Sequence, residues 1–301
     1  MKRGQPTSLF DFQKRFAAPV WRCVAAGLLA LFASGGCTSF VYKTVYNQAD
    51  FLVMRELDRY FDLRSEQRSF LDRRVDQLHV WHRRKELPRY AAALREFRDR
   101  FAVGLKARDI DWLFARSNNF RDAAFRRVYD DAYVFLSSLE RDQMQHLRAA
   151  LRESNEEIVE KIELPRTERL AKRKQSTLEF LEDWSGGLRK DQSREVERLV
   201  EALPELDRSR LRYRRERQSE FLAKLPANGG DPDALRSALR AWLYRPEQTR
   251  PAYYQSGIAD WRAAFRSMAL KIDANLDANQ RRAILQRFNR VIADLDDLSR
   301  R

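Results

Sequence analysis

The chain has few of the residues that interrupt helices or cross-link a fold. Its 301 residues include only 10 glycines, 9 prolines and 2 cysteines. An all-β sandwich needs turn residues every dozen positions or so, which this composition does not supply. Long stretches rich in Leu, Ala, Arg and Glu instead predict an all-α fold. With 44% hydrophobic residues, the chain has enough apolar side chains to bury a core.

The sequence is also poor in catalytic signatures. It has 3 histidines and contains no nucleophile elbow, Walker loop, dinucleotide fingerprint or His-Glu-x-x-His. We therefore expect a protein that is not an enzyme and has no cofactor. A metal-dependent enzyme is an alternative, because the spacing of His79, His82 and Glu86 would place two imidazoles and a carboxylate on one side of a helix. The positive side chains of residues 83–85 would repel a zinc ion at this place.

The longest apolar run lies near the N-terminus and is too short to span a bilayer. It extends from Cys23 to Ser34 and follows a basic segment that ends at Arg22. A spanning helix needs about 20 apolar residues. A basic segment, a short apolar run and then small residues are typical of a secretory signal peptide, which we assign to residues 1–36.

The end of this segment, Ser34-Gly35-Gly36-Cys37, resembles the lipobox of bacterial lipoproteins. The resemblance implies a covalent lipid, palmitate among its chains, on Cys37, and several acyl chains on one residue anchor a protein durably. Because Cys23 is removed with the signal peptide, the mature chain has no disulfide. Thr38 stands where an Asp commonly signals inner-membrane retention, so the resemblance implies a lipoprotein that faces the periplasm at the outer membrane. Ordinary cleavage without a lipid is the alternative.

Residues 37–45 are expected to form a lipidated tether, and the spacing of apolar residues after it is helical. The pair Gly186-Gly187 predicts a division into an N-terminal half (residues 46–187) and a C-terminal half (residues 188–301). Near the C-terminus, apolar residues at alternating spacings of three and four predict two helices that pack antiparallel across a turn at residues 273–275. Four prolines are each expected at the start of a helix, where the missing N–H costs nothing: Pro88, Pro165, Pro204 and Pro232.

The pattern Leu-x-x-x-Gln-x-x-x-apolar occurs four times and predicts four similar helix starts, at Leu63, Leu139, Leu188 and Leu276. The sequence Glu-Leu-Pro-Arg follows the first two copies at nearly the same distance, so each unit predicts one helix of about 24 residues. Duplication of a helical hairpin explains the pattern, with chance similarity as the alternative. The expected fold is an elongated multi-helix bundle of helical hairpins.

Two segments of the mature chain resemble an uncharacterised family of proteobacterial helical lipoproteins. They are residues 46–52 (YNQADFL) and residues 81–90 (WHRRKELPRY). The resemblance covers essentially the whole mature chain and implies an exported helical lipoprotein without an established activity. More loosely, the four copies are similar to the Leu-Thr-x-x-Gln repeats of Spy-type and CpxP-type periplasmic chaperones. The threonine position here holds Arg64, Glu140, Arg189 and Asp277.

The chain is basic, with 58 Lys and Arg against 44 Asp and Glu and a net charge of +14. Most of these charges are interspersed along helices, but one stretch of the second half is dense in arginine: Arg208, Arg210, Arg212, Arg214 and Arg215. Because export keeps nucleic acid out of reach, phospholipid or lipopolysaccharide phosphates and acidic polypeptides are the expected partners of this stretch. A solvated helix surface that binds nothing is the alternative.

These observations lead to three hypotheses about function. The preferred one is a lipid-anchored, non-enzymatic lipoprotein that binds envelope proteins, with chaperone-like activity as one form of that binding. The second is an anion-binding envelope module, and the third is the metal-dependent enzyme. The expected partners are the bacterial membrane, through the lipid, and an envelope protein or anionic lipid, but no nucleic acid.

Overall fold

The structure is a computed structural model that describes residues 43–44, 46–228, 231–244 and 246–300. Within these residues every regular element is a helix, which confirms the predicted all-α class. The same residues include no helix that is both long and apolar enough to cross a bilayer. The predicted signal peptide (residues 1–36) and lipidation site (Cys37) lie outside the described residues.

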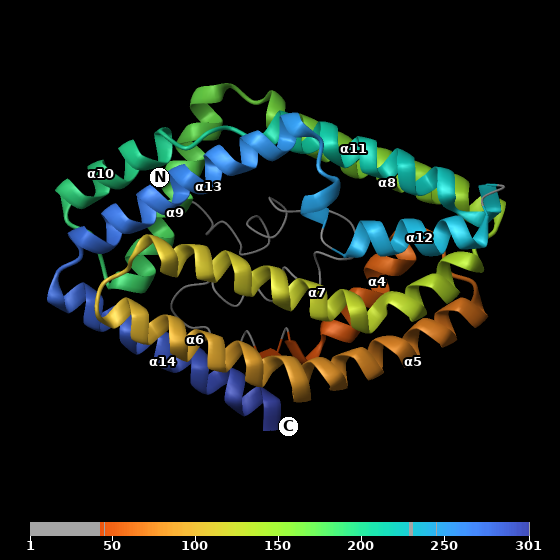
Figure 1. The fold of residues 1–301 in the computed structure, drawn as a ribbon, viewed down its shortest axis with the longest axis horizontal. Coiled ribbons are helices and arrows are strands. Elements are labelled where there is room, and N and C mark those ends of the chain that lie inside the picture. The colour runs from red at the N-terminus through yellow and green to blue at the C-terminus, as the bar shows by residue number, and fades with distance from the viewer. Residues whose placement is uncertain (1–42, 45, 229–230, 245, 301) are drawn as a thin grey trace, which may run out of the picture.

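The helices are arranged as an elongated frame, with the long helices running between its two ends (Figure 1). In chain order they are α4 (Ala49–Phe61), α5 (Ser65–Trp81), the π-helix η1 (His82–Glu86), α6 (Leu87–Ala102), α7 (Ala107–Ser137), α8 (Arg141–Glu163), α9 (Arg166–Ser185), α10 (Lys190–Glu201), α11 (Asp207–Lys224), the 3₁₀ helix η2 (Pro226–Asn228), α12 (Pro232–Leu243), the 3₁₀ helix η3 (Pro246–Thr249), α13 (Ala252–Asn275) and α14 (Ala278–Arg300).

Two groups of four helices have the same internal arrangement. In the first group α5 and α8 pack on α4, and α7 packs on α5. In the second group α10 and α14 pack on α9, and α13 packs on α10. Helices α4, α5, α7 and α8 therefore correspond in order to α9, α10, α13 and α14. This correspondence is what duplication of a pair of hairpins would produce.

The prediction that the last two helices pack against each other is wrong. Helix α13 packs on α7, α10 and α11, whereas α14 packs on α6 and α9. Leu276, between α13 and α14, has an extended backbone (φ −71°, ψ 133°), so the chain leaves the axis of α13 before α14 begins. The apolar seam of α14 was identified correctly, but it is buried against Leu87, Tyr90 and Leu94 of α6 and Trp184 of α9.

The predicted helix-starting prolines behave in three ways. Pro204 does not begin a helix, because it lies two residues before Leu206, the N-cap residue of α11. Pro165 is the N-cap residue of α9 and Pro232 is the first residue of α12, as predicted. Pro88 lies in the first turn of α6, as predicted, but α6 is not a separate helix, because α5, η1 and α6 follow one another without a break. The N–H of Leu87 donates to the carbonyl of His82, five residues earlier, and this wider turn accommodates a proline that a regular α-helix would exclude.

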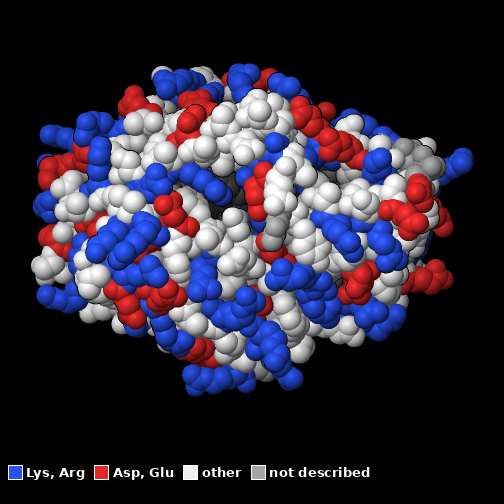
Figure 2. Space-filling view, in the orientation of Figure 1, with Lys and Arg blue, Asp and Glu red and all other residues white. Residues whose placement is uncertain are grey.

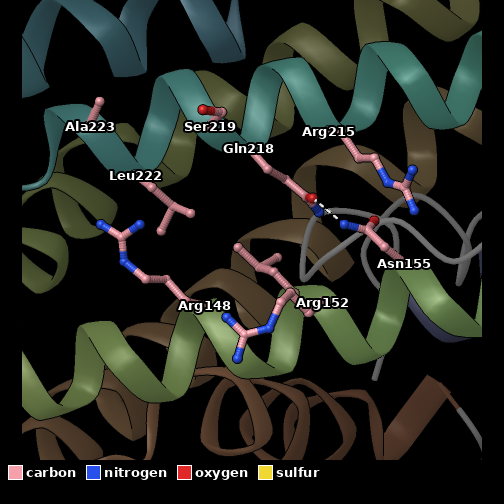
Figure 3. A pocket seen from close by; sticks show the side chains of 9 residues that line it. Arg148, Arg152, Asn155, Arg215, Gln218, Ser219, Leu222 and Ala223 are labelled. Carbon is pink, nitrogen blue, oxygen red and sulfur yellow. Dashed lines mark hydrogen bonds between the residues drawn. The ribbon is translucent and has the colours of Figure 1, made fainter.

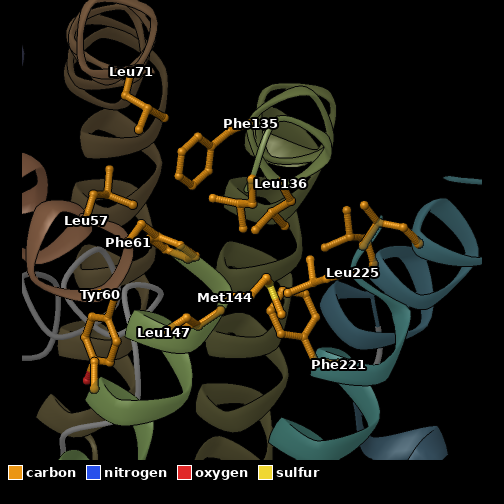
Figure 4. Close-up of a cluster of buried hydrophobic side chains, with 14 of the residues drawn as sticks. Leu57, Tyr60, Phe61, Leu71, Phe135, Leu136, Met144, Leu147, Phe221 and Leu225 are labelled. Atoms are coloured by element: carbon orange, nitrogen blue, oxygen red, sulfur yellow. The ribbon is translucent and has the colours of Figure 1, made fainter. Parts of the chain in front are cut away.

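Three clusters of buried side chains hold the frame together. One joins α4, α5, α7, α8, α11 and α12 (Figure 4), another joins α6, α9 and α14, and the last joins α9, α10 and α13. Gly186 ends α9 in the left-handed conformation (φ 78°) that glycine adopts without strain. The predicted boundary is thus a turn, and helices from both sides of it share all three clusters.

Candidate functional site

The four Leu-x-x-x-Gln copies meet in two pairs, which we call the glutamine junctions. In the first junction, Gln67 of α5 and Gln143 of α8 bond to each other through their side-chain amides, at 2.7 and 3.1 Å. Each Oε1 also accepts from the N–H of its own N-cap residue, Arg64 or Glu140. Each glutamine therefore caps its own helix and binds the other helix start at the same time.

Each glutamine of the first junction also binds the end of the helix that precedes its partner. Nε2 of Gln143 donates to the carbonyls of Phe61 and Asp62, at the end of α4, at 2.9 and 3.0 Å. Nε2 of Gln67 donates to the carbonyl of Ser138, at the end of α7, at 3.0 Å. Four helix ends are thereby joined at one place.

The second glutamine junction repeats this arrangement at the other end of the frame. Gln192 of α10 and Gln280 of α14 bond to each other at 2.8 Å in both directions. Nε2 of Gln192 donates to Asn275, at the end of α13, and Nε2 of Gln280 donates to Gly187, which follows α9. Asp277 completes the capping box that the sequence predicted for α14. The structure thus gives all four repeat copies one shared structural role.

The two segments that carry the family resemblance also lie together. The hydroxyl of Tyr46 is 2.9 Å from Nδ1 of His82, and Nη2 of Arg83 donates to the side chain of Asn47 at 2.8 Å. The guanidinium of Arg83 lies over the ring of Tyr46, 5.2 Å from its centre. The segment before α4 is thereby fixed to the widened turn between α5 and α6.

Three buried polar side chains, His82, Glu86 and Tyr90, follow one another along this widened turn. They are 8%, 1% and 7% exposed. Arg89 donates to one oxygen of Glu86 at 2.5 Å, but Nε2 of His82, the other oxygen of Glu86 and the hydroxyl of Tyr90 have no partner among the described residues. Burial, with smaller contributions from His79 and Arg83, lowers the pKa of His82 to about 4. This imidazole is therefore neutral at neutral pH.

The proposed metal ligands His79, His82 and Glu86 are not gathered into a ligand set. No group of three or more His, Cys, Asp and Glu side chains in the described part of the chain is placed to hold a metal ion. The side chains of His82 and Glu86 are instead engaged by Tyr46 and Arg89, respectively. The ring of His79 instead meets Tyr46 edge-on, with ring centres 4.9 Å apart.

The five sequence-predicted arginines lie on α11 but do not form one patch. Arg208, Arg212 and Arg215 are exposed and spaced at i, i+4 and i+7, whereas Arg210 and Arg214 are half-buried and lie on another face. Arg212 pairs with Glu216 at 2.9 Å. Arg214 donates to Asn155 and Ser154 of α8, and burial lowers its pKa. Only part of this stretch is available to a ligand.

A groove between α8 and α11 was not expected from the sequence. It has a volume of about 370 Å³ and is lined by Arg148, Leu151, Arg152, Asn155, Arg215, Gln218, Ser219, Leu222 and Ala223 (Figure 3). Arg215 brings one of the predicted arginines to this groove, and α8 supplies two more. Arg148 and Arg152 are four residues apart, which is the sequence signal that could have indicated two like charges on one helix face.

Comparison with known proteins provides a family but no activity. No curated protein and no solved structure is significantly similar to the chain. A family of unknown function (DUF6279) matches residues 59–255, which include both segments of the first glutamine junction and the groove between α8 and α11. The chain therefore belongs to the DUF6279 family, whose function is unknown.

Proposed function

We propose that the protein is a lipid-anchored, non-enzymatic lipoprotein of the bacterial envelope whose helical frame binds other envelope proteins from the periplasmic side. The leader at residues 1–36 and the lipobox ending at Cys37 support export and anchoring. The single observation that carries the binding role is the open frame. Its helices are held by three separate clusters instead of one central core, and one face of the molecule is hollowed near its middle (Figure 2).

An open frame suits a binding module because it presents a large, indented surface on a fixed scaffold. Several large apolar side chains are exposed on different helices, among them Phe51 (64%) and Val134 (52%). Basic and acidic side chains are interspersed over the face seen in Figure 2. Apolar contacts surrounded by mixed charge are typical of surfaces that bind proteins without a deep pocket.

The resemblance to Spy-type and CpxP-type chaperones supports one form of this proposal, in which the bound proteins are unfolded clients. It rests on the Leu-x-x-x-Gln copies, and here these copies join helix ends. The motif therefore supports a similar way of building a helical frame, while the exposed apolar side chains are what would bind a client.

The anchor is tested by replacing Cys37. We expect Cys37→Ser to abolish acylation and release the mature chain from the membrane fraction, since no other residue carries the lipid in this proposal. Cys23→Ser, within the proposed signal peptide, is the matched control and should leave anchoring unchanged. Acylation that persists in Cys37→Ser, measured by mass spectrometry, would contradict the anchor.

Binding is tested by crosslinking in cells. A photoreactive residue at Phe51, Val80 or Val134, which are exposed apolar positions, is expected to capture a reproducible set of envelope proteins. The same residue at the exposed charged positions Lys190 and Glu220 is the control. The proposal fails if the apolar positions capture nothing beyond the control and the purified protein does not slow aggregation of an unfolded client.

The anion-binding module is the second candidate, and the net charge of +14 with the exposed Arg208 and Arg215 favours it. It predicts co-sedimentation with vesicles that contain anionic lipid and a loss of binding as salt is added. Equal binding to neutral and anionic vesicles, insensitive to salt, would remove this candidate.

A further inference from the structure

The groove between α8 and α11 gathers positive charge without balancing carboxylates. Arg148 and Arg152 project from α8 and Arg215 from α11, and the other residues of the lining are apolar or uncharged (Figure 3). Many arginines elsewhere in the described residues have a carboxylate within ion-pair distance, for example Arg95 with Asp296 and Arg266 with Asp111. In the same part of the chain, no carboxylate pairs with any of the three groove arginines.

This concentration of like charge is unfavourable unless something compensates for it. Arg148 and Arg152 are neighbours at i and i+4 on one helix, a spacing at which like charges destabilise the helix. Arg215 adds a third positive charge across the groove. A negatively charged ligand would relieve this repulsion and accept charge-assisted hydrogen bonds from planar guanidinium groups, which suit phosphate oxygens particularly well.

The inner wall of the groove offers a further hydrogen-bond donor. Gln218 is 6% exposed, and its Oε1 accepts from Nδ2 of Asn155 at 2.8 Å (Figure 3). Its Nε2 is buried and has no partner among the described residues. A buried donor without a partner costs free energy, so a polar ligand atom that reached this amide would be stabilised. The side chain of Asn155 already bonds to both Arg214 and Gln218.

Apart from Ser219, the remaining lining of the groove is apolar. Leu151 of α8 lies opposite Leu222 and Ala223 of α11, and Leu222 also packs against the large cluster that joins α4, α5, α7, α8, α11 and α12. The volume of about 370 Å³ lies within the usual range of small-molecule sites. The groove therefore combines arginines that suit an anion with an apolar wall that suits a hydrocarbon chain.

We propose that this groove binds a phospholipid-type amphiphile, with its phosphate attracted by the combined positive charge of Arg148, Arg152 and Arg215 and the first part of its alkyl chain against Leu151 and Leu222. The three guanidinium groups lie at different places along the groove (Figure 3), so the phosphate contacts those nearest to it. The site goes beyond the proposed protein-binding role and does not depend on it. It also differs from the arginine-rich stretch predicted from the sequence, since two of its three arginines lie on α8.

The test is calorimetric titration of the full chain carrying Cys37→Ser. This substitution removes the proposed lipid on Cys37, so that the titration is done without detergent. The probe is dodecyl phosphate below its micelle concentration, compared with inorganic phosphate and with dodecyl maltoside, a neutral amphiphile of the same chain length. We expect saturable binding of dodecyl phosphate at one site per chain. Binding should weaken at least about tenfold in the groove variant Arg148→Gln/Arg152→Gln/Arg215→Gln.

A matched control removes the same charge elsewhere. Arg194, Arg282 and Arg290 are exposed and lie on α10 and α14, away from the groove. The variant Arg194→Gln/Arg282→Gln/Arg290→Gln should bind dodecyl phosphate as the parent chain does. The single variant Arg215→Gln provides a milder test if the triple groove variant loses its helical circular dichroism, and it should still weaken binding measurably.

Four results of the titrations with dodecyl phosphate, dodecyl maltoside and inorganic phosphate would overturn the proposal, and a fifth comes from an acidic peptide. They are the absence of saturable binding, an equal loss in the groove and control variants, equally tight binding of dodecyl maltoside, and equally tight binding of inorganic phosphate. Binding of an acidic peptide such as hexaglutamate in place of dodecyl phosphate would likewise reject a lipid in favour of a polypeptide. None of these outcomes bears on whether the frame crosslinks to envelope proteins, so failure of this site and failure of the proposed function are distinguishable.

Discussion

At the scale of single residues, the buried polar cluster at the widened turn is the most unusual feature. His82 lies between Tyr46 and Tyr90, with ring centres 5.8 and 5.4 Å from its own, and one of its ring nitrogens has no partner among the described residues. The fold can bury this imidazole because it is neutral, and the cost appears only when it is protonated.

His82 should therefore make stability depend on pH. Its pKa is lowered to about 4 in the fold, against an ordinary value of 6.5. Between these values the unfolded chain binds more protons, so the free energy of unfolding should fall as pH drops from about 6.5 toward 4, by at most about 1.4 kcal/mol per pH unit. Urea unfolding across this range measures the slope.

The variant His82→Asn should flatten that slope relative to the parent chain. His146→Asn is the matched control, because His146 is exposed and lies on α8. The pKa of the half-buried His79 is also lowered by burial, but His79 is present in both variants and contributes equally to the pH dependence of the free energy of unfolding in each. An unchanged slope in His82→Asn would show that this imidazole is not the buried titrating group.

At the scale of elements, the glutamine junctions should contribute strongly to stability. In Gln143→Ala, the carbonyls of Phe61 and Asp62, the N–H of Glu140 and the side chain of Gln67 would each lose a partner. We expect the free energy of unfolding to fall by about 2 to 3 kcal/mol. Denaturant titration should show less than about 0.5 kcal/mol for Gln145→Ala, which removes an exposed glutamine from the same helix.

A double-mutant cycle distinguishes the bonds between Gln67 and Gln143 from the capping bond that each glutamine makes to its own helix. If Gln67 and Gln143 act together, Gln67→Ala should cost much less when Gln143 is already alanine, with a coupling of about 1 kcal/mol. Additive losses would mean that each glutamine only caps its own helix.

The sequence predicted the elements much better than their partners. Apolar spacing and capping residues identify α13, α14 and the four repeat starts, because these signals are local. It was not possible to predict that Gln67 meets Gln143, or that α14 packs on α6 instead of α13, since both depend on contacts between distant parts of the chain. The π-helix before Pro88 was missed because the spacing arguments assumed regular α-helices. The spacing of Arg148 and Arg152 is visible in the sequence, but that α11 lies across the groove from them depends on contacts between distant parts of the chain.

At the scale of the whole molecule, the predicted halves share their cores. Without residues 188–301, α6 would lose α14, and Leu87, Tyr90 and Leu94 would be left uncovered. We therefore expect residues 46–187 alone to bind a hydrophobic dye and to unfold without a sharp transition. Co-expression with residues 188–301 should restore cooperative unfolding, and a sharp transition in the isolated half would instead support two independent domains.

The order of the junctions along the chain has a consequence for how the protein is assembled. Gln67 and Gln143 both precede Gln192 and Gln280, so the four similar glutamines do not interleave. Because the chain is synthesised from its N-terminus, Gln67 and Gln143 can form their junction before Gln192 and Gln280 are made. This order disfavours mispairing between a glutamine of one junction and a glutamine of the other. The side of α6 that α14 covers, however, stays uncovered until α14 is made, and α14 follows the other described helices along the chain. A prematurely terminated chain would therefore display uncovered leucines to proteases, which gives the cell a direct way to remove incomplete copies.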